Sequence, residues 1–475
     1  MYRKDENTLI VKKGYKEGML TDAVIYADRV IEKTLEKEAV NQIINVTTLP
    51  GILGNAIAMP DIHKGYGFPI GGVAAFDIES GVISPGGIGY DINCGVRLVS
   101  TSLKKEEVDK RKKELVLSLY SEVPLGVGSK GSIKLTDSDY SVLLKKGALW
   151  AVEKGYGNEE DLENIESKGF LDLEDLVVGR KAMERGRKQM GSLGSGNHFL
   201  EVQYIDEIFD EKAADELGFF KGQIFVMIHT GSRGFGHQIC SDYVNIMIGA
   251  ARKYGIRLYD KELSCAPFKS EEGQNYFNSM KAAANFAWAN RQILKYISEK
   301  VFLKVFGISP KMLSFKTVYD VAHNIAKIEK HDINGEKKEV LVHRKGATRA
   351  FGPLDCEVSE KYRKFGQPVI IPGDMGRESY LLLGQNLSMN KSFGSSCHGA
   401  GRVMSRSMAI ENAKGKDIKK ELYDKGILLM AGSKDTIAEE MSDAYKDVSD
   451  VVKVIERVGI SKRLLRLKPI CVIKG

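Results

Sequence analysis

The side chains best suited to bind a metal ion are spread over most of this chain, and that spread constrains the fold more than any other feature. They are an aspartate and a cysteine three positions apart and four of the eight histidines, all in motifs that contain glycine or asparagine: Asp91, Cys94, His198, His229, His323 and His398. Carboxylate, thiolate and imidazole groups together are a ligand set for divalent transition metals. One site built from these residues must draw on nearly the whole chain, so the sequence predicts a single interwoven domain over residues 1–475.

Short apolar segments alternate with amphipathic or charged ones, which predicts an α/β fold of mixed α+β character with short strands and glycine-rich site loops. Strands are predicted at residues 9–11, 201–204, 225–228, 340–343, 369–371 and 470–473. Helices are predicted at residues 21–37, 102–118, 270–305, 320–327, 402–413 and 435–457, and residues 136–190 are expected to be helical and polar. The order of the strands cannot be read from this pattern.

Composition narrows the class of protein. The net charge of +7 permits a polyanionic partner without requiring one. No apolar run reaches the roughly 18 residues of a membrane helix, and the charged start lacks the apolar core of a signal peptide. The six cysteines are scattered without a CxxC pair, so a disulfide framework is not expected. We therefore expect a cytoplasmic protein with reduced thiols and no membrane association.

Asp91 and Cys94 lie in a glycine-bounded turn that can aim both side chains at one point, and a thiolate can bridge two cations. Alone, the pair also suits an Asx turn beside a small buried cysteine. His198 and His323 each suit a structural role when taken singly, the second as a core histidine in a helix. The imidazoles outnumber the needs of one tetrahedral ion, which leaves two readings: two ions, or one histidine that acts as a nucleophile.

Two motifs point to phosphate chemistry. His229 ends a β-run, and Arg233 follows among glycines, which suits an oxyanion, although a surface ion pair is the alternative for this arginine. Gly399 after His398 lets a second substrate approach, and a helix from Arg402 would offer its N-terminus to a phosphate. This pattern fits a histidine that attacks phosphorus, and equally a histidine packed in a glycine-rich turn.

The remaining histidines and basic clusters differ in how strongly they indicate a functional role. His63 and His343 lie in polar, glycine-rich segments and can contact substrate, whereas His331 is expected to be exposed. His237 is read as structural or as a minor member of the site. Basic clusters at 180–188 and 462–468 can follow a nucleic-acid backbone or be solvated surface. No GxxxxGK[ST] loop and no Lys-x-Asp-Gly motif is present.

Taken together, these motifs resemble the RtcB family of RNA-splicing ligases from about residue 57 to residue 475. The matching segments are residues 59–71, 86–97, 194–201, 229–234, 343–352, 372–380 and 397–402. The resemblance implies a ligase that joins RNA 2′,3′-cyclic phosphate or 3′-phosphate ends to 5′-hydroxyl ends, in tRNA splicing or RNA repair. It implies two Mn²⁺ ions and GTP as co-substrate. The implied partner is RNA, as tRNA halves or cleaved RNA, and a need for an archease-type activator stays open.

Site residues follow from the same resemblance. It makes Asp91, Cys94, His198, His229 and His323 the manganese ligands, with Cys94 bridging, and His398 the residue that takes GMP. The implied GTP pocket comprises Asn197, Phe199, Glu201, Ser379, Gly399, Ala400, Gly401, Tyr445 and Lys474. Arg233 and the Arg344–Lys345 pair are implied contacts of RNA or phosphate. Asp374 stands where the family pattern has serine, and we assign it no nucleotide role, because a carboxylate near a triphosphate is repulsive unless a cation intervenes.

Two rival functions use part of the same pattern. A metal-dependent cyclic phosphodiesterase would need the metal ligands but would leave the His398 motif idle. An RNA-binding module without catalysis would use the basic clusters but would leave the ligand set unexplained.

Overall fold

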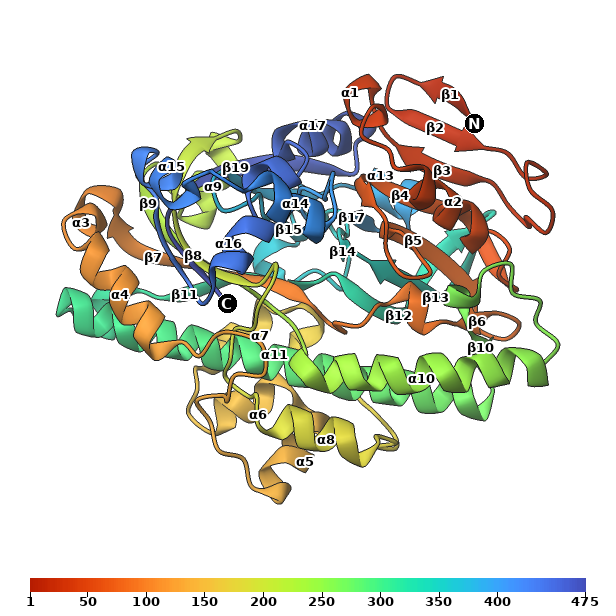
Figure 1. Ribbon diagram of the computed structural model, residues 1–475, viewed down its shortest axis with the longest axis horizontal. Helices are drawn as coiled ribbons and strands as arrows, with labels where there is room; N and C mark the ends of the chain where they lie inside the picture. The colour runs from red at the N-terminus through yellow and green to blue at the C-terminus, as the bar shows by residue number, and fades with distance from the viewer.

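Two large β-sheets organise the chain in a computed structural model that describes residues 1–475 (Figure 1). The first sheet has the strand order β1-β2-β3-β4-β5-β13-β12. Its strands are β1 (Tyr2–Asp5), β2 (Thr8–Val11), β3 (Ala23–Tyr26), β4 (Ile52–His63), β5 (Ile70–Asp77), β13 (Glu336–Lys345) and β12 (Asn324–Ile333). All pairs are antiparallel except β3 with β4.

The second sheet has the order β11-β7-β9-β8-β19-β16-β15, and β18 pairs parallel with β19. Its strands are β11 (Lys316–Ala322), β7 (Gly95–Lys104), β9 (Gln223–Thr230), β8 (Phe199–Ile208), β19 (Ser461–Lys474), β16 (Ser379–Gly384), β15 (Pro368–Ile371) and β18 (Leu428–Ala431). The chain leaves this sheet at Ala322 and enters the first at Asn324, so His323 lies where the two sheets meet. Two small ribbons pair β6 (Val82–Ile83) with β10 (Ala266–Pro267) and β14 (Ala347–Arg349) with β17 (Ser395–Cys397).

Two long helices, α10 (Arg233–Lys253) and α11 (Glu271–Phe306), pack together and run along one side of the molecule (Figure 1). Ser270 caps the start of α11 by accepting from the backbone of Gly273, and Gly307 ends it at φ +65°. Buried apolar side chains of α11 point to most sides of the helix, as is typical of a helix buried on most sides. On the outer side of the two helices lie α5 (Asp137–Lys146), α6 (Ala148–Glu153) and α8 (Arg180–Arg187).

Short helices complete the fold. Near the N-terminus and the first sheet lie α1 (Arg29–Glu32) and α2 (Lys37–Val46); others are α3 (Lys105–Asp109), α4 (Lys112–Glu122), α7 (Glu159–Glu163), α9 (Glu211–Leu217), α12 (Pro310–Leu313) and α13 (Leu387–Ser392). The C-terminal region adds α14 (Arg406–Asn412), α15 (Ile418–Asp424), α16 (Lys434–Glu439) and α17 (Val448–Val458). The largest hydrophobic core holds 81 buried residues and joins the first sheet to α10 and α11. No helix is both long and apolar enough to cross a lipid bilayer.

The mixed α/β class and the long helix predicted at 270–305 are confirmed, but two predicted helices are wrong. Residues 21–37 contain the buried strand β3, and a full helix begins only at Lys37. Residues 320–327 are the end of β11 and the start of β12, so His323 is not in a helix. Pairing of Asp320 with Arg97 and of Ile325 with Arg344 across neighbouring strands outweighs the local helical spacing. The helix predicted at 102–118 begins as strand β7 and breaks into α3 and α4.

Candidate active site

Four adjacent strands bring the predicted metal ligands to one edge of the second sheet. Cys94 directly precedes β7, His198 directly precedes β8, His229 is the last residue but one of β9, and His323 directly follows β11. Neighbouring strands in the order β11-β7-β9-β8 run antiparallel, so two strand starts and two strand ends lie side by side. Residues far apart in the sequence therefore meet without any long loop.

The turn that carries Asp91 and Cys94 is held by the long helix α11. Asn93 has a left-handed backbone (φ +50°), and its side-chain amide donates to the carbonyl of Ala284 at 2.7 Å. Arg291, fully buried, donates to the carbonyl of Asn93 at 2.8 Å. The Asn93 side chain and the Arg291 side chain thus anchor the turn to the helix through two hydrogen bonds.

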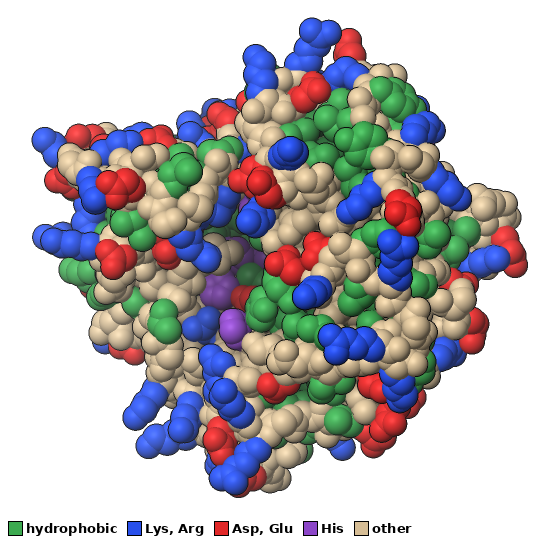
Figure 2. Space-filling view, turned by 45° about the vertical axis from the view of Figure 1, so that its right-hand side comes forward, with side chains coloured by type: hydrophobic (Ala, Val, Ile, Leu, Met, Phe, Trp, Pro, Cys, Tyr) green, Lys and Arg blue, Asp and Glu red, His purple; other side chains and the backbone are tan.

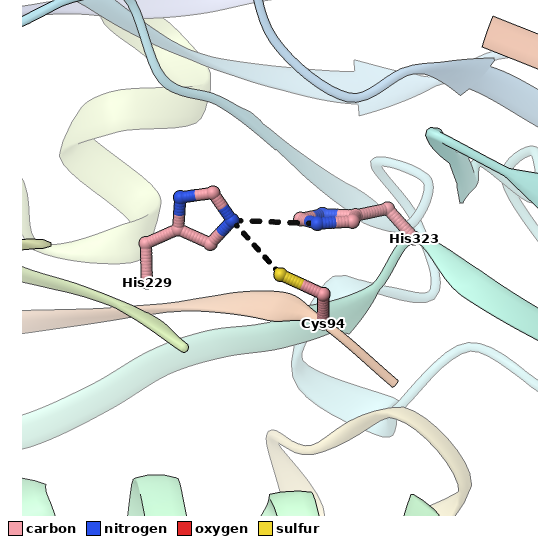
Figure 3. A group of neighbouring side chains, drawn as sticks. All are labelled: Cys94, His229 and His323. Carbon is pink, nitrogen blue, oxygen red and sulfur yellow. Dashed lines mark hydrogen bonds between the residues drawn. The ribbon is translucent and has the colours of Figure 1, made fainter. Parts of the chain in front are cut away.

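The five predicted ligands converge (Figure 3 shows three of them). Cys94 Sγ lies 3.3 Å from His198 Nε2 and 3.3 Å from His229 Nε2. His229 Nε2 lies 3.3 Å from His323 Nε2, and His198 Nε2 lies 2.8 Å from Asp91 Oδ2. Metal bonds of about 2.0–2.3 Å in tetrahedral geometry place ligand atoms roughly 3.3–3.7 Å apart. The three separations of 3.3 Å therefore suit bound cations, whereas the 2.8 Å contact of Asp91 with His198 is a hydrogen-bond distance. The ligand atoms form two groups that share Cys94: one with His229 and His323, the other with Asp91 and His198.

Hydrogen bonds alone do not give every polar atom of this cluster a partner, whereas bound cations would. Asp91 Oδ1 is buried without a hydrogen-bond partner, and His229 Nε2 faces both Cys94 and His323 although it can donate only one proton. Burial lowers the pKa of His229 and of His323 well below the usual value, so both rings are neutral and offer lone pairs. Burial, reinforced by Asp91, raises the pKa of the Cys94 thiol, and a bound cation would favour the thiolate.

His398 is oriented by a buried aspartate. Its Nδ1 donates to Asp61 Oδ2 at 2.6 Å, and the same oxygen accepts from the backbone N–H groups of His398 (2.9 Å) and Gly399 (3.3 Å). Burial alone would raise the pKa of Asp61, but the His398 ring and backbone hold it below its usual value. Lys446 donates to the carbonyls of Pro60 (3.0 Å) and Ile62 and so fixes the segment around Asp61. With Nδ1 occupied, the lone pair of His398 resides on Nε2.

His398 joins the five predicted metal ligands, which we call the metal cluster, to a cavity of about 360 Å³, which we call the first cavity. The rings of His323 and His398 have centroids 5.0 Å apart, and both His229 and His398 line the cavity. Figure 2 shows histidine side chains at the bottom of a hollow in the surface, with lysine and arginine side chains around it.

Most residues of the implied GTP pocket lie on the wall of the first cavity: Asn197, Phe199, Gly399, Ala400, Gly401, Tyr445 and Lys474. Glu201 and Ser379 do not reach its surface and lie buried behind it. Gln203 links the two by donating to Glu201 Oε2 at 2.7 Å and to Ser379 Oγ at 3.0 Å. Burial raises the pKa of Glu201 to about 8, although Gln203 and Lys474 act in the opposite direction.

Charges on this wall are paired. Glu440 accepts from Lys474 at 3.0 Å, from Arg402 at 3.1 Å and from the hydroxyl of Tyr445. Asp374 also lines the cavity; it accepts from the Ser442 hydroxyl and from the Gly376 N–H, and the Arg377 guanidinium lies 3.5 Å away. Burial raises the pKa of the Asp374 carboxyl, although these donors and that cation act in the opposite direction.

A second cavity of about 440 Å³ lies on the Asp91–His198 side of the metal cluster. Basic side chains line it, among them Arg185, Lys188 and Arg233. Arg233 has a left-handed backbone (φ +56°), and its Nη1 donates to His198 Nδ1 at 3.3 Å. The metal cluster therefore forms the wall between two cavities of different character.

Several predictions about other residues are wrong. His343 is buried between Phe68 and Phe76 in β13, where its Nε2 accepts from the Ser84 N–H at 3.3 Å. His331 is buried, not exposed, and lies 3.1 Å from Glu329. His63 does line the first cavity.

The Arg344–Lys345 pair is not available to RNA. Arg344 is fully buried and forms a two-point ion pair with Glu329 at 2.6 and 2.8 Å. Lys345 is buried and donates to the backbone carbonyls of Tyr66 and Gly86.

The helix expected from Arg402 begins instead at Arg406, so a loop presents Gly399 and Gly401 to the cavity.

Sequence reasoning missed three residues that shape the site: Asp61, Glu440 and Lys446. The signal for Asp61 was its place among Pro60, His63 and the glycines of a segment already singled out. Glu440 and Lys446 lie near Tyr445 of the implied GTP pocket, but no motif marked either residue.

Comparisons with known proteins point to one family over nearly the whole chain. The family model described as tRNA-splicing ligase RtcB matches residues 42–475. The tRNA-splicing ligase RtcB of Archaeoglobus fulgidus is 52% identical over 98% of this chain and 96% of its own length. The protein of the same name from Methanococcus maripaludis is 50% identical over 99% and 98% of the two chains, and that from Thermococcus kodakarensis is 52% identical over 97% and 96%.

Proposed function

The chain belongs to the RtcB family of tRNA-splicing ligases, and on this premise we propose that it joins RNA 2′,3′-cyclic phosphate or 3′-phosphate ends to 5′-hydroxyl ends, using GTP and two Mn²⁺ ions. RNA ligation in tRNA splicing is the activity that the family carries. The observation that supports the finer proposal is His398: its Nδ1 is engaged by Asp61, it lines the first cavity, and its ring neighbours that of His323.

The residues present fit two cations. Asp91, Cys94, His198, His229 and His323 would hold them, with Cys94 shared. When bound, the cations neutralise charge on the triphosphate and on the reacting phosphoryl groups. Thiolate is a soft ligand, and Zn²⁺ binds such sites more tightly than Mn²⁺, so Zn²⁺ is expected to compete and inhibit.

The first step forms a bond between His398 and guanylate. Nε2 attacks the α-phosphorus of GTP, the bond from that phosphorus to the bridging oxygen breaks, and pyrophosphate leaves. Asp61 keeps Nδ1 protonated and stabilises the charge that develops on the ring. The Gly399–Gly401 loop lets the phosphate approach the ring closely, because no side chain larger than that of Ala400 stands in the way.

The later steps transfer guanylate to RNA and then release it. An oxygen of the RNA 3′-phosphate attacks the same phosphorus and frees His398, giving RNA-3′-pp-5′-G. The 5′-hydroxyl oxygen of the second RNA attacks the RNA phosphorus, its proton is lost, and GMP leaves as the phosphodiester forms. A cyclic phosphate is first opened by water to a 3′-phosphate.

Covalent labelling tests the proposal against its rivals. Full-length protein incubated with α-labelled GTP and Mn²⁺ should become labelled, and His398→Ala should not, although it should still bind GTP. The adduct should be acid-labile and base-stable, as expected for a phosphoramidate. RNA with a 3′-hydroxyl and a 5′-phosphate should not be joined.

A cyclic phosphodiesterase or a non-catalytic RNA-binding module would show no label. Mapping of the label to a residue other than His398 would overturn the assignment.

A further inference from the structure

Three aromatic rings, which we call the aromatic stack, extend to the second cavity and have no role in the chemistry described so far. The rings of Tyr66 and Tyr90 lie 5.5 Å apart, edge to face at 64°. The rings of Tyr90 and His237 lie 4.9 Å apart at a tilt of 34°. Tyr66 and Tyr90 are half-buried, whereas His237 is exposed and lines the second cavity. The stack thus begins at two half-buried rings and ends at a ring open to that cavity.

Hydrogen bonding does not explain these rings. The backbone carbonyl of Tyr66 accepts a hydrogen bond from Lys345, and that of His237 accepts one from the Ser241 hydroxyl. No side-chain polar atom of the three has a partner in the protein. By contrast, His63, His331 and His343 each make a hydrogen bond through a ring nitrogen. The exposed ring of His237 is therefore free to contact a ligand.

The stack stands beside the metal cluster and beside cations. Tyr90 directly precedes Asp91, and His237 lies one turn after Arg233 in α10. Helix α8 packs on α10, and Arg185 donates to Gln238, the neighbour of His237, at 3.0 Å. Basic groups that follow phosphates, interleaved with aromatic rings that accept bases, are what proteins use to bind single-stranded nucleic acid.

We propose that the aromatic stack receives an unpaired nucleobase of the RNA end held in the second cavity, as a fourth ring on His237. The inference rests on the proposed function, because it takes an RNA end to occupy that cavity. Every base has a π-face, so the contact tolerates any sequence. A base within a duplex has both faces covered, so the stack favours an unpaired end over a paired one.

An abasic scan tests the proposal. Full-length protein with Mn²⁺ and without GTP is titrated with short 5′-hydroxyl RNA oligonucleotides that carry one abasic residue at successive positions. At one position, removal of the base should raise Kd about 10-fold, within the range for loss of one stacked base. With His237→Ala, the intact RNA should bind about 10-fold more weakly, and the abasic residue at that position should add no further loss.

Conservative variants and fluorescence separate stacking from a structural role. His237→Tyr should restore the affinity and Tyr90→Phe should keep it, because both retain the ring. A 2-aminopurine base at the same position should be quenched on binding to the wild type and not to His237→Ala; the wild-type measurement stands even if a variant fails to fold. Tyr15→Ala, which removes a tyrosine that is 67% exposed outside the site, should change nothing.

The proposal is overturned if no abasic position weakens wild-type binding, or if the losses from His237→Ala and from the abasic residue simply add. RNA that binds and is ligated without any effect of base removal would refute this inference alone. Failure of the wild type to bind RNA at all would refute the proposed function as well.

Discussion

The two cavities on either side of the metal cluster differ in how their charges are arranged. In the first cavity, Lys474 and Arg402 are tied to Glu440, and Asp374 is tied to Arg377. In the second, Arg185 and Lys188 have no carboxylate partner. A fixed network suits one ligand of defined shape, whereas free cations suit a polyanion whose sequence varies. The difference supports the assignment of the nucleotide to the first cavity and of RNA to the second.

Among the substitutions, loss of Cys94, which both ligand groups share, should have the largest effect. Cys94 belongs to both ligand groups, so Cys94→Ala should abolish covalent labelling by GTP and also ligation, to the background of the assay. Bound Mn²⁺, measured by elemental analysis, should fall in parallel. Cys240→Ala is a matched control, because Cys240 is also buried but belongs to neither ligand group. Undiminished activity in excess chelator would contradict the metal assignment.

The second-largest effect should be confined to the first cavity. Asp61→Asn should slow formation of the His398 adduct on the order of 10³–10⁴-fold, because an amide cannot hold the ring in the required tautomer. RNA binding in the second cavity should be unchanged. The measurement is the single-turnover rate of labelling. A rate within a few-fold of wild type would mean that Asp61 has only a structural role.

The predicted metal ligands could be identified from the sequence, whereas the residue that orients His398 could not. The five predicted metal ligands carry recognisable side chains in short motifs, and the structure brings all five together. Asp61 could not be assigned, because its bond to His398 joins residues 337 positions apart and depends on sheet packing. The mixed α/β class followed from the alternation of segments. The helix predicted around His323 failed because spacing of apolar residues cannot distinguish one helix from two short strands that belong to different sheets.

A third expected effect is a pH dependence of nucleotide binding. The family resemblance assigns Glu201, which lies buried behind the first cavity, to the GTP pocket, and we expect its carboxylate to accept from guanine N1–H and N2–H₂ when the nucleotide binds. Below its pKa of about 8 the Glu201 carboxyl is protonated and cannot accept both. Affinity for GMP should therefore rise with pH by up to about tenfold per unit below pH 8 and level off above it. Equilibrium titration between pH 7 and 8.5 measures the slope. Glu201→Gln should show none, and an equal slope in both proteins would remove Glu201 from base recognition.

The smallest effect belongs to the second cavity. Lys188→Ala should weaken RNA binding only a few-fold and lower the slope of log K against log salt by about 1, since one phosphate contact is lost. Labelling by GTP should not change. Lys361→Ala, remote from both cavities, serves as the control. A defect in labelling would show that the two cavities are not separate in function.

The place of β19 in the second sheet has a consequence for how the enzyme matures on the ribosome. Residues 461–474 are made after every other strand of that sheet, yet β19 lies between β8 and β16. Until it inserts, those two strands face each other with unpaired edges, and Lys474 is missing from the first cavity. A nascent chain therefore contains His398 well before the first cavity is complete. Chains that stop before β19 are therefore expected to lack a complete first cavity and, because two strand edges stay unpaired, to be prone to aggregate.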